Sequence, residues 1–376
     1  MTLEVARRLA LRGDKVEWFA ASYPGAPDEE VIDGVRIVRS GRQWSVHWRA
    51  FRRYRSNATQ NFDVVVDQVN TMPFFAPRWA HVPVVMFIHQ LAREVWWYES
   101  KFPISAVGYV AEPRYLRTYK AVPVITVSDS TKADLVRLGL NGPITVIPEG
   151  LEAVGSARAV PADTPSFVYV GRLNRSKRVD DIIRAFGIFG QTVEGGSLTL
   201  IGDGPPPYVD ELKRLAKRLG VNDQVRFVGR VSTELKHLEL ARAHAILLAS
   251  VREGWGLVVT EANAMGVPAI GYDVPGLRDS IRHDSTGLLV DASPASMAKG
   301  MLDMWVSPVL HDRLSAAALE WARSFSFDNT AQAFRAALEA AIGSQAAPGK
   351  GLREVKMDIP NSPAVSHQTG PQPRDD

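Results

Sequence analysis

Two carboxylates eight positions apart, Glu253 and Glu261, are the side chains with the clearest chemical use, and Gly254 and Gly256 stand beside the first. Carboxylate oxygens accept hydrogen bonds from sugar hydroxyls, and glycine lets the backbone approach a ligand closely because it has no Cβ. If most of the residues between them are helical, a rise of about 1.5 Å each separates the carboxylates by roughly 10–12 Å. A sugar–diphosphate–ribose unit has a comparable length. Taken alone, however, such a pair is more often ordinary surface charge.

The apolar pattern around this pair predicts the elements that position it. An apolar strand, Ala245–Ala249, leads into the glycine-containing loop, a helix runs through Gly266, and a second apolar strand covers Ala269–Tyr272. This order is typical of a crossover connection in a parallel sheet, where ligands bind outside the carboxyl ends of the strands. The helix would point the backbone N–H groups from Trp255 to Val258 at an anion. A phosphate would suit this loop.

The segment closely resembles the E-x7-E motif of retaining glycosyltransferases of family 4. It reads Ser250…Glu253-Gly254-Trp255-Gly256-Leu257…Glu261-Ala262…Gly266-Val267-Pro268. The resemblance covers nearly all of the carboxyl-terminal half, through Val168-Tyr169-Val170-Gly171-Arg172-Leu173…Lys177, Leu200-Ile201-Gly202-Asp203-Gly204-Pro205, Val225-Arg226-Phe227-Val228-Gly229 and Thr286-Gly287-Leu288-Leu289-Val290. Such an ordered set of motifs is highly specific.

The resemblance implies a fold, a donor site and a set of catalytic residues. The fold class is α/β with the GT-B architecture, in which two Rossmann-like parallel-sheet domains face each other across a cleft. Glu253 would bind the donor sugar's hydroxyls, Glu261 the ribose, and the backbone of Arg230 and Val231 the nucleobase. The implied catalytic residues are Glu253, Arg172, Lys177 and His89. The implied donor-binding residues are Gly171, Arg230, Val231, Gly254, Trp255, Gly256, Leu257, Val258 and Glu261.

Two cations after the predicted strand Phe167–Val170 are candidates for phosphate recognition. Arg172 offers a planar fork of donors and Lys177 a point charge, and a predicted helix, Val179–Phe189, follows them. The alternative is a charged surface turn. Because a strand precedes the pair and a helix follows it, we favour the phosphate role.

His89 ends an apolar strand, Val84–His89, where a Rossmann-like half presents functional groups. A solitary histidine is more often structural than catalytic, but its place resembles that of the amino-domain histidine that faces the donor sugar in this family. The aromatic segment Gln90–Tyr98 could line an acceptor site or meet a membrane, or pack under a loop. Glu149 stands where the family usually has asparagine, so we expect altered hinge contacts near the donor.

The predicted organisation has two domains, joined by a linker. Residues 1–150 form the acceptor-side Rossmann-like domain, 151–165 the linker and 166–325 the nucleotide-sugar domain. A last helix over 326–343 packs back on the first domain, and 344–376 is predicted to be disordered. The chain opens with a helix from Leu3 to Ala10, whereas the family has a strand and a glycine-rich loop first. We therefore expect the genuine start to lie upstream.

Composition narrows the classes of partner. The formal charge is only +3, which gives no reason to expect a nucleic acid partner, and the absence of cysteine excludes disulfides and thiolate metal sites. No metal-binding constellation is visible, so we expect no metal and no other cofactor. No apolar run approaches about 18 residues, and we expect a cytoplasmic protein. Basic and aromatic residues interleave over Gly41–Arg55, which indicates either an anionic membrane surface or an ordinary surface helix.

The function that follows is a retaining glycosyltransferase. It would move a sugar from a nucleotide-diphosphate donor to a hydroxyl of a glycan or lipid-linked acceptor, in the synthesis of a glycan, a glycolipid or a cell-surface polysaccharide. The alternatives are a non-catalytic nucleotide-sugar-binding remnant or scaffold and a GT-B sugar-nucleotide epimerase. The motifs do not name the sugar, the base or the acceptor.

Overall fold

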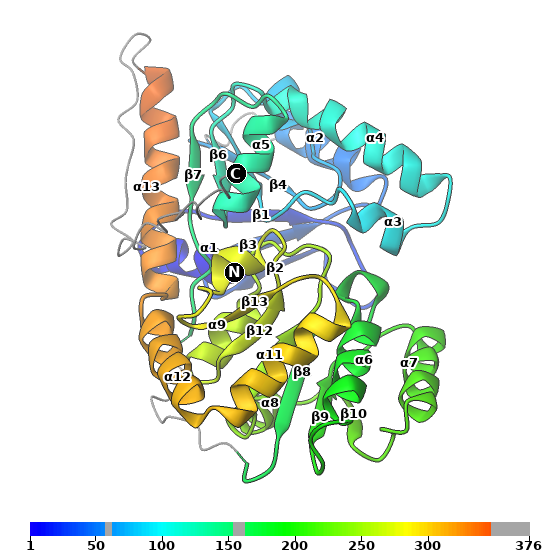
Figure 1. The fold of residues 1–376 in the computed structure, drawn as a ribbon. Coiled ribbons are helices and arrows are strands. Elements are labelled where there is room, and N and C mark those ends of the chain that lie inside the picture. Colours follow the sequence, from blue (N-terminus) through cyan, green and yellow to red (C-terminus); the bar gives the residue numbers. More distant parts are fainter. Residues whose placement is uncertain (57–61, 153–161, 347–376) are drawn as a thin grey trace, which may run out of the picture.

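The computed structural model describes residues 1–56, 62–152 and 162–346. They form two α/β domains, one above the other in Figure 1, with the amino-terminal half in the upper domain. Most of the predicted linker and almost all of the predicted disordered tail, at 153–161 and 347–376, lie outside the described residues.

The carboxyl-terminal domain is built on one six-stranded sheet, in the order β10-β9-β8-β11-β12-β13, and every pairing is parallel. The strands are β8 (Ser166–Val170), β9 (Ser197–Ile201), β10 (Val225–Gly229), β11 (Ala245–Leu248), β12 (Ala269–Tyr272) and β13 (Gly287–Val290). The strand β13 runs parallel to β12, because the short helix α10 (Leu277–Ser280) intervenes in the connection.

Helices cover both faces of this sheet. They are α6 (Val179–Phe189), α7 (Pro206–Arg218), α8 (Thr233–Ala241), α9 (Leu257–Asn263), α11 (Pro294–Val306) and α12 (Pro308–Arg323), and the one-turn helix η3 (Arg175–Lys177) precedes α6. The central strands β11 and β12 are buried along their whole length, as expected for a sheet covered on both sides, and two hydrophobic clusters fill the space between sheet and helices.

The amino-terminal half has two sheets where we expected one. In the first, β1 (Glu17–Ala20) pairs in parallel with β3 (Val35–Arg39), and β2 (Glu29–Ile32) pairs antiparallel with β3. In the second, β4 (Val65–Val69), β5 (Val84–Ile88), β6 (Val124–Thr126) and β7 (Ile144–Val146) are all parallel. Among the described residues, no strand joins β1 to β4.

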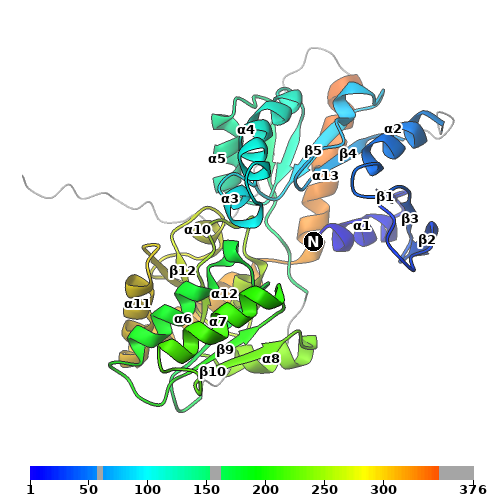
Figure 2. The ribbon, with the colours of Figure 1, turned by 90° about the vertical axis from the view of Figure 1, so that its right-hand side faces the viewer.

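The helices of this half are α1 (Thr2–Leu11), α2 (Val46–Ser56), α3 (Val95–Glu99), α4 (Ile104–Leu116) and α5 (Asp129–Arg137), with the one-turn helices η1 (Ala76–Arg78) and η2 (Arg117–Tyr119). In Figure 2, α2 and the small sheet lie at one end of the upper domain and α3, α4 and α5 at the other. The sequence analysis did not predict α4.

The last described helix, α13 (Phe327–Ala346), leaves the carboxyl-terminal domain and packs on the amino-terminal one. It runs along the left side of Figure 1 and lies beside α1 in both views. Phe334 meets Phe87 of β5 edge-on at 5.2 Å between ring centroids, and Arg335 pairs with Asp14 at 2.9 Å. Phe87 and Phe334 share a hydrophobic cluster with Trp255, so α13 packs against both the amino-terminal domain and the loop that precedes α9.

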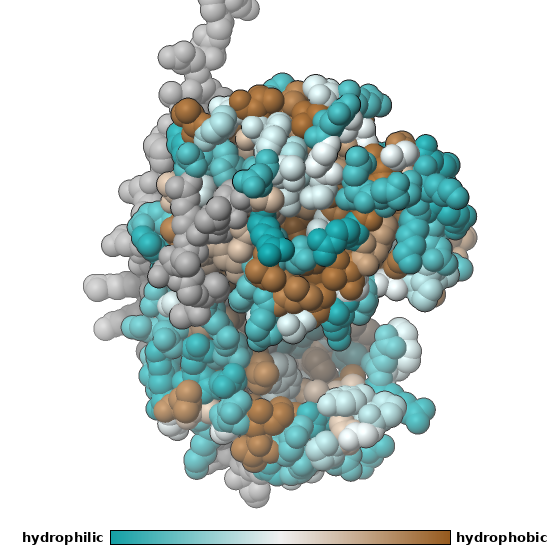
Figure 3. Space-filling model, turned by 90° about the horizontal axis from the view of Figure 1, so that it is seen from below, coloured by the Kyte–Doolittle hydropathy of each residue, from teal (hydrophilic) through white to brown (hydrophobic). Residues whose placement is uncertain are grey.

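The surface is not uniformly polar. On the face seen from below, hydrophobic residues gather in separate patches among hydrophilic ones (Figure 3). None of the helices within residues 1–56, 62–152 and 162–346 is long and apolar enough to cross a membrane.

Candidate active site

The loop between β11 and α9 carries the first of the two predicted carboxylates. Glu253 lies here with a side chain 15% exposed, and its Oε1 is 2.5 Å from Lys177 Nζ and 2.6 Å from Ser250 Oγ. Lys177 belongs to η3, after β8, so the crossover topology brings the predicted cation and the predicted carboxylate together. Ser250 is an additional partner that we did not predict.

The helix after this loop is shorter than predicted. Gly256 precedes it with φ of +87°, a left-handed conformation that glycine adopts readily, and α9 ends at Asn263 rather than at Gly266. It ends there because the chain turns: the N–H groups of Met265 and Val267 both donate to Ala262 O. Within the part of the chain that the structure describes, no acceptor is assigned to the backbone N–H groups from Trp255 to Val258.

Glu261 lies inside α9, and a second lysine holds it. Lys236 Nζ of α8 is 2.8 Å from Glu261 Oε2, and both side chains are about one-fifth exposed, at 20% and 22%. The sequence analysis missed Lys236. No local motif marks it, because it reaches the site from a helix on a different crossover.

Arg172 is the second of the two predicted phosphate-binding cations. Its side chain is exposed, and no ion pair joins it to a carboxylate among the described residues. The hydroxyl of Tyr169 donates to Arg172 O at 2.7 Å. Burial, and then the charge of Glu253, hold the pKa of Tyr169 well above its ordinary value, so this phenol stays a neutral donor. Gly171 lies directly before Arg172, and a Cβ on Gly202 would fall 1.9 Å from Gly171 O.

The two residues predicted at the nucleobase lie farther along the same sheet. Arg230 and Val231 follow β10, which is the edge strand next to β9. The Arg230 side chain is 87% exposed and its Nε is 3.7 Å from Asp203 Oδ2. Among the described residues, neither Arg230 nor Val231 contacts Glu253 or Lys177 through a hydrogen bond or an ion pair.

His89 follows β5 in the amino-terminal domain and faces the loop of Glu253. A Cβ on Gly254 would lie 3.1 Å from His89 O, so a larger residue would require this contact to widen by a few tenths of an ångström. His89 Nδ1 is 2.9 Å from Glu149 Oε1, and the two side chains are 25% and 12% exposed. The sequence analysis noted both residues but did not predict this contact, which joins the ends of β5 and β7.

Polar contacts join the two domains next to the site. Arg252, only 8% exposed, pairs with Asp134 of α5 at 2.6 Å and with Glu94, before α3, at 3.2 Å. The N–H of Ser176 donates to Glu99 at 3.2 Å, and the N–H of Ser130 donates to Asp279 at 3.0 Å. The loop that carries Glu253 is therefore anchored to the opposite domain.

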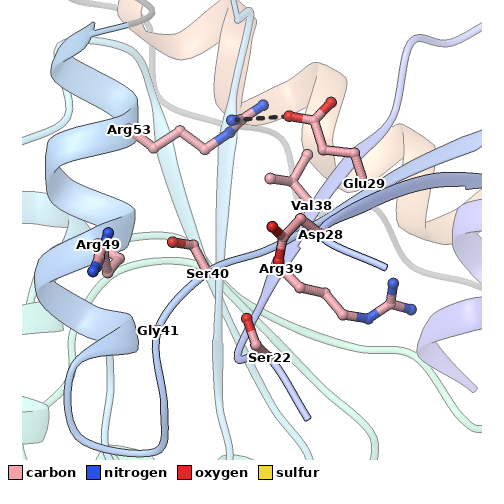
Figure 4. Close-up of a pocket in the computed structure, with 9 residues that line it drawn as sticks. All are labelled: Ser22, Asp28, Glu29, Val38, Arg39, Ser40, Gly41, Arg49 and Arg53. Atoms are coloured by element: carbon pink, nitrogen blue, oxygen red, sulfur yellow. Dashed lines mark ion pairs between the residues drawn. The ribbon is translucent and has the colours of Figure 1, made fainter. Parts of the chain in front are cut away.

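A separate hollow of about 310 Å³ lies between β2, β3 and α2 (Figure 4). Arg39 in its wall pairs with Glu30, and Arg53 pairs with Glu17 at 2.8 Å, whereas Arg49 has no ion pair with a described carboxylate. The hollow offers hydroxyls and guanidinium groups, but carboxylates already hold two of its three arginines.

No group of three or more His, Cys, Asp and Glu side chains in the described ranges could hold a metal ion. The cations closest to the predicted diphosphate position are side chains of the protein itself. The expectation that the protein needs no metal stays a prediction.

Comparison with known proteins bears on both halves of the chain. The model of the family described as "Glycosyltransferase Family 4" matches residues 1–153, and that described as "Glycosyl transferases group 1" matches residues 156–321. A D-inositol 3-phosphate glycosyltransferase of Nocardioides sp. is 27% identical over 88% of this chain and 82% of its own length. A GDP-mannose-dependent phosphatidylinositol monomannoside mannosyltransferase of Mycobacterium tuberculosis is 32% identical over 42% of this chain and 43% of its own.

Solved structures share the fold. Sucrose-phosphate synthase from Thermosynechococcus elongatus superposes with a TM-score of 0.75 at 21% identity, covering 90% of this chain and 93% of that one. Anabaena HepE in complex with UDP and glucose gives a TM-score of 0.69 at 16% identity, covering 90% and 95%. The predicted α/β fold class of the GT-B type is thereby confirmed.

Proposed function

This chain belongs to glycosyltransferase family 4, and from that premise we propose that it moves a sugar from a nucleotide-diphosphate donor to an acceptor hydroxyl with retention of the anomeric configuration. The observation that carries the proposal is the Lys177–Glu253 pair, which stands beside Arg172 and the N–H groups from Trp255 to Val258. Cation, carboxylate and donors therefore lie where a donor's sugar and diphosphate would meet.

Each of these groups has a role in the proposed reaction. Lys177 and Arg172 neutralise the diphosphate as the bond between the anomeric carbon and the phosphate oxygen breaks, which stabilises charge where it develops. Lys177 must then turn from Glu253 to the phosphate, which frees Glu253 to accept hydrogen bonds from the sugar. Glu261 would bind the ribose hydroxyls at the other end of the donor.

The retaining outcome is tested by the product. We infer that the acceptor attacks from the face that the diphosphate leaves, with a donor phosphate oxygen accepting the acceptor's proton. Proton NMR of the first product formed from an α-linked donor should show an α-linkage. A β-linked first product would contradict retention. Conversion of the donor sugar without any acceptor would instead favour the epimerase alternative, and binding of donor without turnover the non-catalytic one.

We also propose that the reaction needs no metal ion, because Lys177 and Arg172 can take the place of Mg²⁺ at the diphosphate. Activity should persist in excess EDTA. Complete loss in EDTA, restored by adding Mg²⁺, would contradict the proposal.

The donor base is best assigned by experiment, because the relatives differ. One relative's name specifies GDP-mannose, whereas HepE was solved with UDP. A thermal-shift panel of UDP, GDP and ADP tests the base, since a ligand at about 100 times its dissociation constant adds roughly 2.7 kcal/mol to the stability. We expect one of the three nucleotides to stabilise the wild-type chain, and we expect its stabilising effect to be smaller in Glu261→Ala.

We further propose that the protein lies at the inner membrane surface, through a surface on α3 and α4. The exposed large apolar side chains of this α3–α4 surface are Trp97, Tyr98, Phe102, Ile104, Val107 and Val110. Residues 104, 107, 110, 114 and 117 are all exposed, and this spacing places them on one side of the helical segment. That side is therefore apolar at its beginning and basic, with Arg114 and Arg117, at its end.

The charges of the α3–α4 surface fit an anionic bilayer. Arg93, Arg114 and Arg117 line a hollow of about 320 Å³ beside the apolar side chains. Of the nearby acidic side chains, Glu112 is buried and accepts from two backbone N–H groups, which lie 2.6 and 2.7 Å away. Glu94 and Glu99 are exposed, but they contact Arg252 and the N–H of Ser176 in the other domain. A basic rim around apolar side chains is typical of proteins that rest on anionic lipid.

Vesicle sedimentation tests this location. We expect binding to vesicles that contain phosphatidylglycerol and little binding to phosphatidylcholine alone. Val107→Asp should weaken the binding, whereas Val309→Asp, at a position 81% exposed in the other domain, should not. No binding by the wild-type chain at low salt, or equal binding by both variants, would contradict the proposal.

A further inference from the structure

Glu149 and His89 form a contact that the family resemblance did not predict. Their side chains come from the carboxyl ends of two strands of one sheet, β7 and β5, and meet at 2.9 Å between Oε1 and Nδ1. The family pattern usually has asparagine at the position of Glu149. A charged acceptor therefore stands where a neutral amide is more usual.

Both partners are held firmly. The ring of His89 packs on Phe87 at 4.6 Å between centroids, and His89 O accepts from Thr131 Oγ1 at 3.2 Å. On the other side, Pro148 O accepts from Thr330 Oγ1 at 3.1 Å. A Cβ on Gly150 would lie 2.5 Å from Phe327 N. The start of α13 thus clamps the segment that carries Glu149.

The chemistry of the two groups decides which nitrogen carries the proton. An ionised carboxylate only accepts hydrogen bonds, so the hydrogen of this contact must sit on Nδ1. In a neutral imidazole the other nitrogen, Nε2, is then a bare acceptor. An asparagine amide could either donate or accept, so it would not require the proton of the ring to sit on Nδ1. His89 is 25% exposed, and its backbone and Cβ lie beside Gly254, the residue after Glu253: a Cβ built on Gly254 would lie 3.1 to 3.3 Å from them.

We propose that Glu149 is a positioning residue that fixes His89 with Nδ1 protonated, so that Nε2 accepts a hydrogen bond from a hydroxyl of the donor sugar. The role toward the sugar rests on the proposed glycosyl transfer. The form of the histidine ring rests only on the contact itself, and the two parts can be tested separately.

Nitrogen-15 NMR of the histidine ring tests the first part without donor or acceptor. The ring signals of His89 are identified as those that disappear in the spectrum of His89→Gln. In the wild-type chain at neutral pH we expect a protonated Nδ1 and a bare Nε2. Glu149→Leu should move the proton to Nε2. Glu149→Gln, whose amide can donate as well as accept, should leave a mixture of the two ring forms. The matched control Glu152→Gln, at an exposed carboxylate three residues along, should change nothing. A wild-type proton on Nε2, or no change in Glu149→Leu, would overturn the proposal.

Kinetics test the second part. Removing a group that orients a functional histidine typically costs about 10- to 100-fold, and we expect such a fall in kcat for Glu149→Leu. The affinities for UDP and GDP, which lack the sugar, should stay unchanged. Glu149→Gln, which allows both ring forms, should have a kcat between those of Glu149→Leu and the wild-type chain. Unchanged kcat in Glu149→Leu would overturn the role toward the sugar. If the wild-type chain transferred no sugar at all, the proposed function would fail while the NMR result still stood.

Discussion

Lys177 and Glu253 lie 76 positions apart in the chain, yet Lys177 Nζ is 2.5 Å from Glu253 Oε1, and each side chain is less than one-fifth exposed. The cation that we propose for the diphosphate and the carboxylate that we propose for the sugar thus neutralise each other in this pair. Under the proposed function, donor binding must separate them, so the pair should influence both nucleotide affinity and the rate of transfer.

Glu253→Gln should separate these two effects. The substitution removes the charge that holds Lys177, so UDP or GDP should bind at least as tightly as to the wild-type chain, while sugar transfer falls about 100-fold. Calorimetric titration and a transfer assay measure the two quantities. The control is Glu211→Gln, which removes an exposed pair with neighbouring Arg175 and should leave both unchanged. Weaker nucleotide binding by Glu253→Gln would contradict the proposal that Lys177 leaves Glu253 to bind the diphosphate.

Gly276→Ala should disturb Glu253 through its backbone. A Cβ at Gly276 would lie 2.1 Å from Glu253 O, and the residue has φ of +86°. Gly195→Ala is the matched control, because it has φ of +74° with nothing within 4 Å of the added Cβ. Both variants bear the strain of the left-handed conformation, about 1 kcal/mol. Only Gly276→Ala should lose transfer activity, by roughly 10-fold or more. Equal activities in the two variants would show that the position of Glu253 tolerates the displacement.

Arg252→Ala should loosen the contact between the domains. The substitution leaves the carboxylates of Asp134 and Glu94 without their shared cation. Arg252 is buried but these carboxylates are 16% and 51% exposed, so we expect a loss of about 2 kcal/mol, between that of a surface pair and that of a fully buried pair. Arg137→Ala removes a different partner of the same Asp134, but that arginine is 75% exposed, so a loss below about 1 kcal/mol is expected. Urea unfolding followed by circular dichroism compares the two. Equal losses would contradict the assignment of Arg252 as the domain anchor.

The stability should fall in mild acid because of His244. Burial, and then the neighbouring His311, lower the pKa of His244 from 6.5 to about 4. The unfolded chain therefore binds a proton in this range that the folded chain does not, and stability is lost as the pH falls from about 6.5 toward 4. His244→Asn keeps an acceptor for the N–H of Ser166 and should flatten the profile over this range. The exposed-histidine variant His81→Gln should leave it unchanged, and a flat wild-type profile would contradict the prediction.

Much of the carboxyl-terminal fold could be predicted because the central strands of its sheet are apolar and its motifs are specific. Ala269–Tyr272 was predicted with its observed bounds, and Phe167–Val170 and Ala245–Ala249 within about a residue of theirs. The hairpin of β2 and β3 was missed, although Asp33 and Gly34 at its turn are a strong signal: both have positive φ, at 50° and 83°.

The contacts that complete the site could not be predicted from local patterns. Lys236 approaches Glu261 from another helix, and Asp134 reaches Arg252 from another domain. Glu149 and His89 stand 60 positions apart. In each case tertiary packing, rather than any sequence spacing, sets which side chains meet. The sequence could identify the residues of the motifs but not their partners.

The most direct test of the central claim is the release of nucleoside diphosphate from UDP-glucose, GDP-mannose and ADP-glucose, measured with the wild-type chain and with Lys177→Ala. We expect the wild-type chain to release the nucleoside diphosphate from one of these three donors. Lys177→Ala should release it at least about 100-fold more slowly. Equal rates for the two chains would contradict the placement of the donor diphosphate at Lys177. No release from any of the three donors by the wild-type chain would contradict the proposed transfer itself.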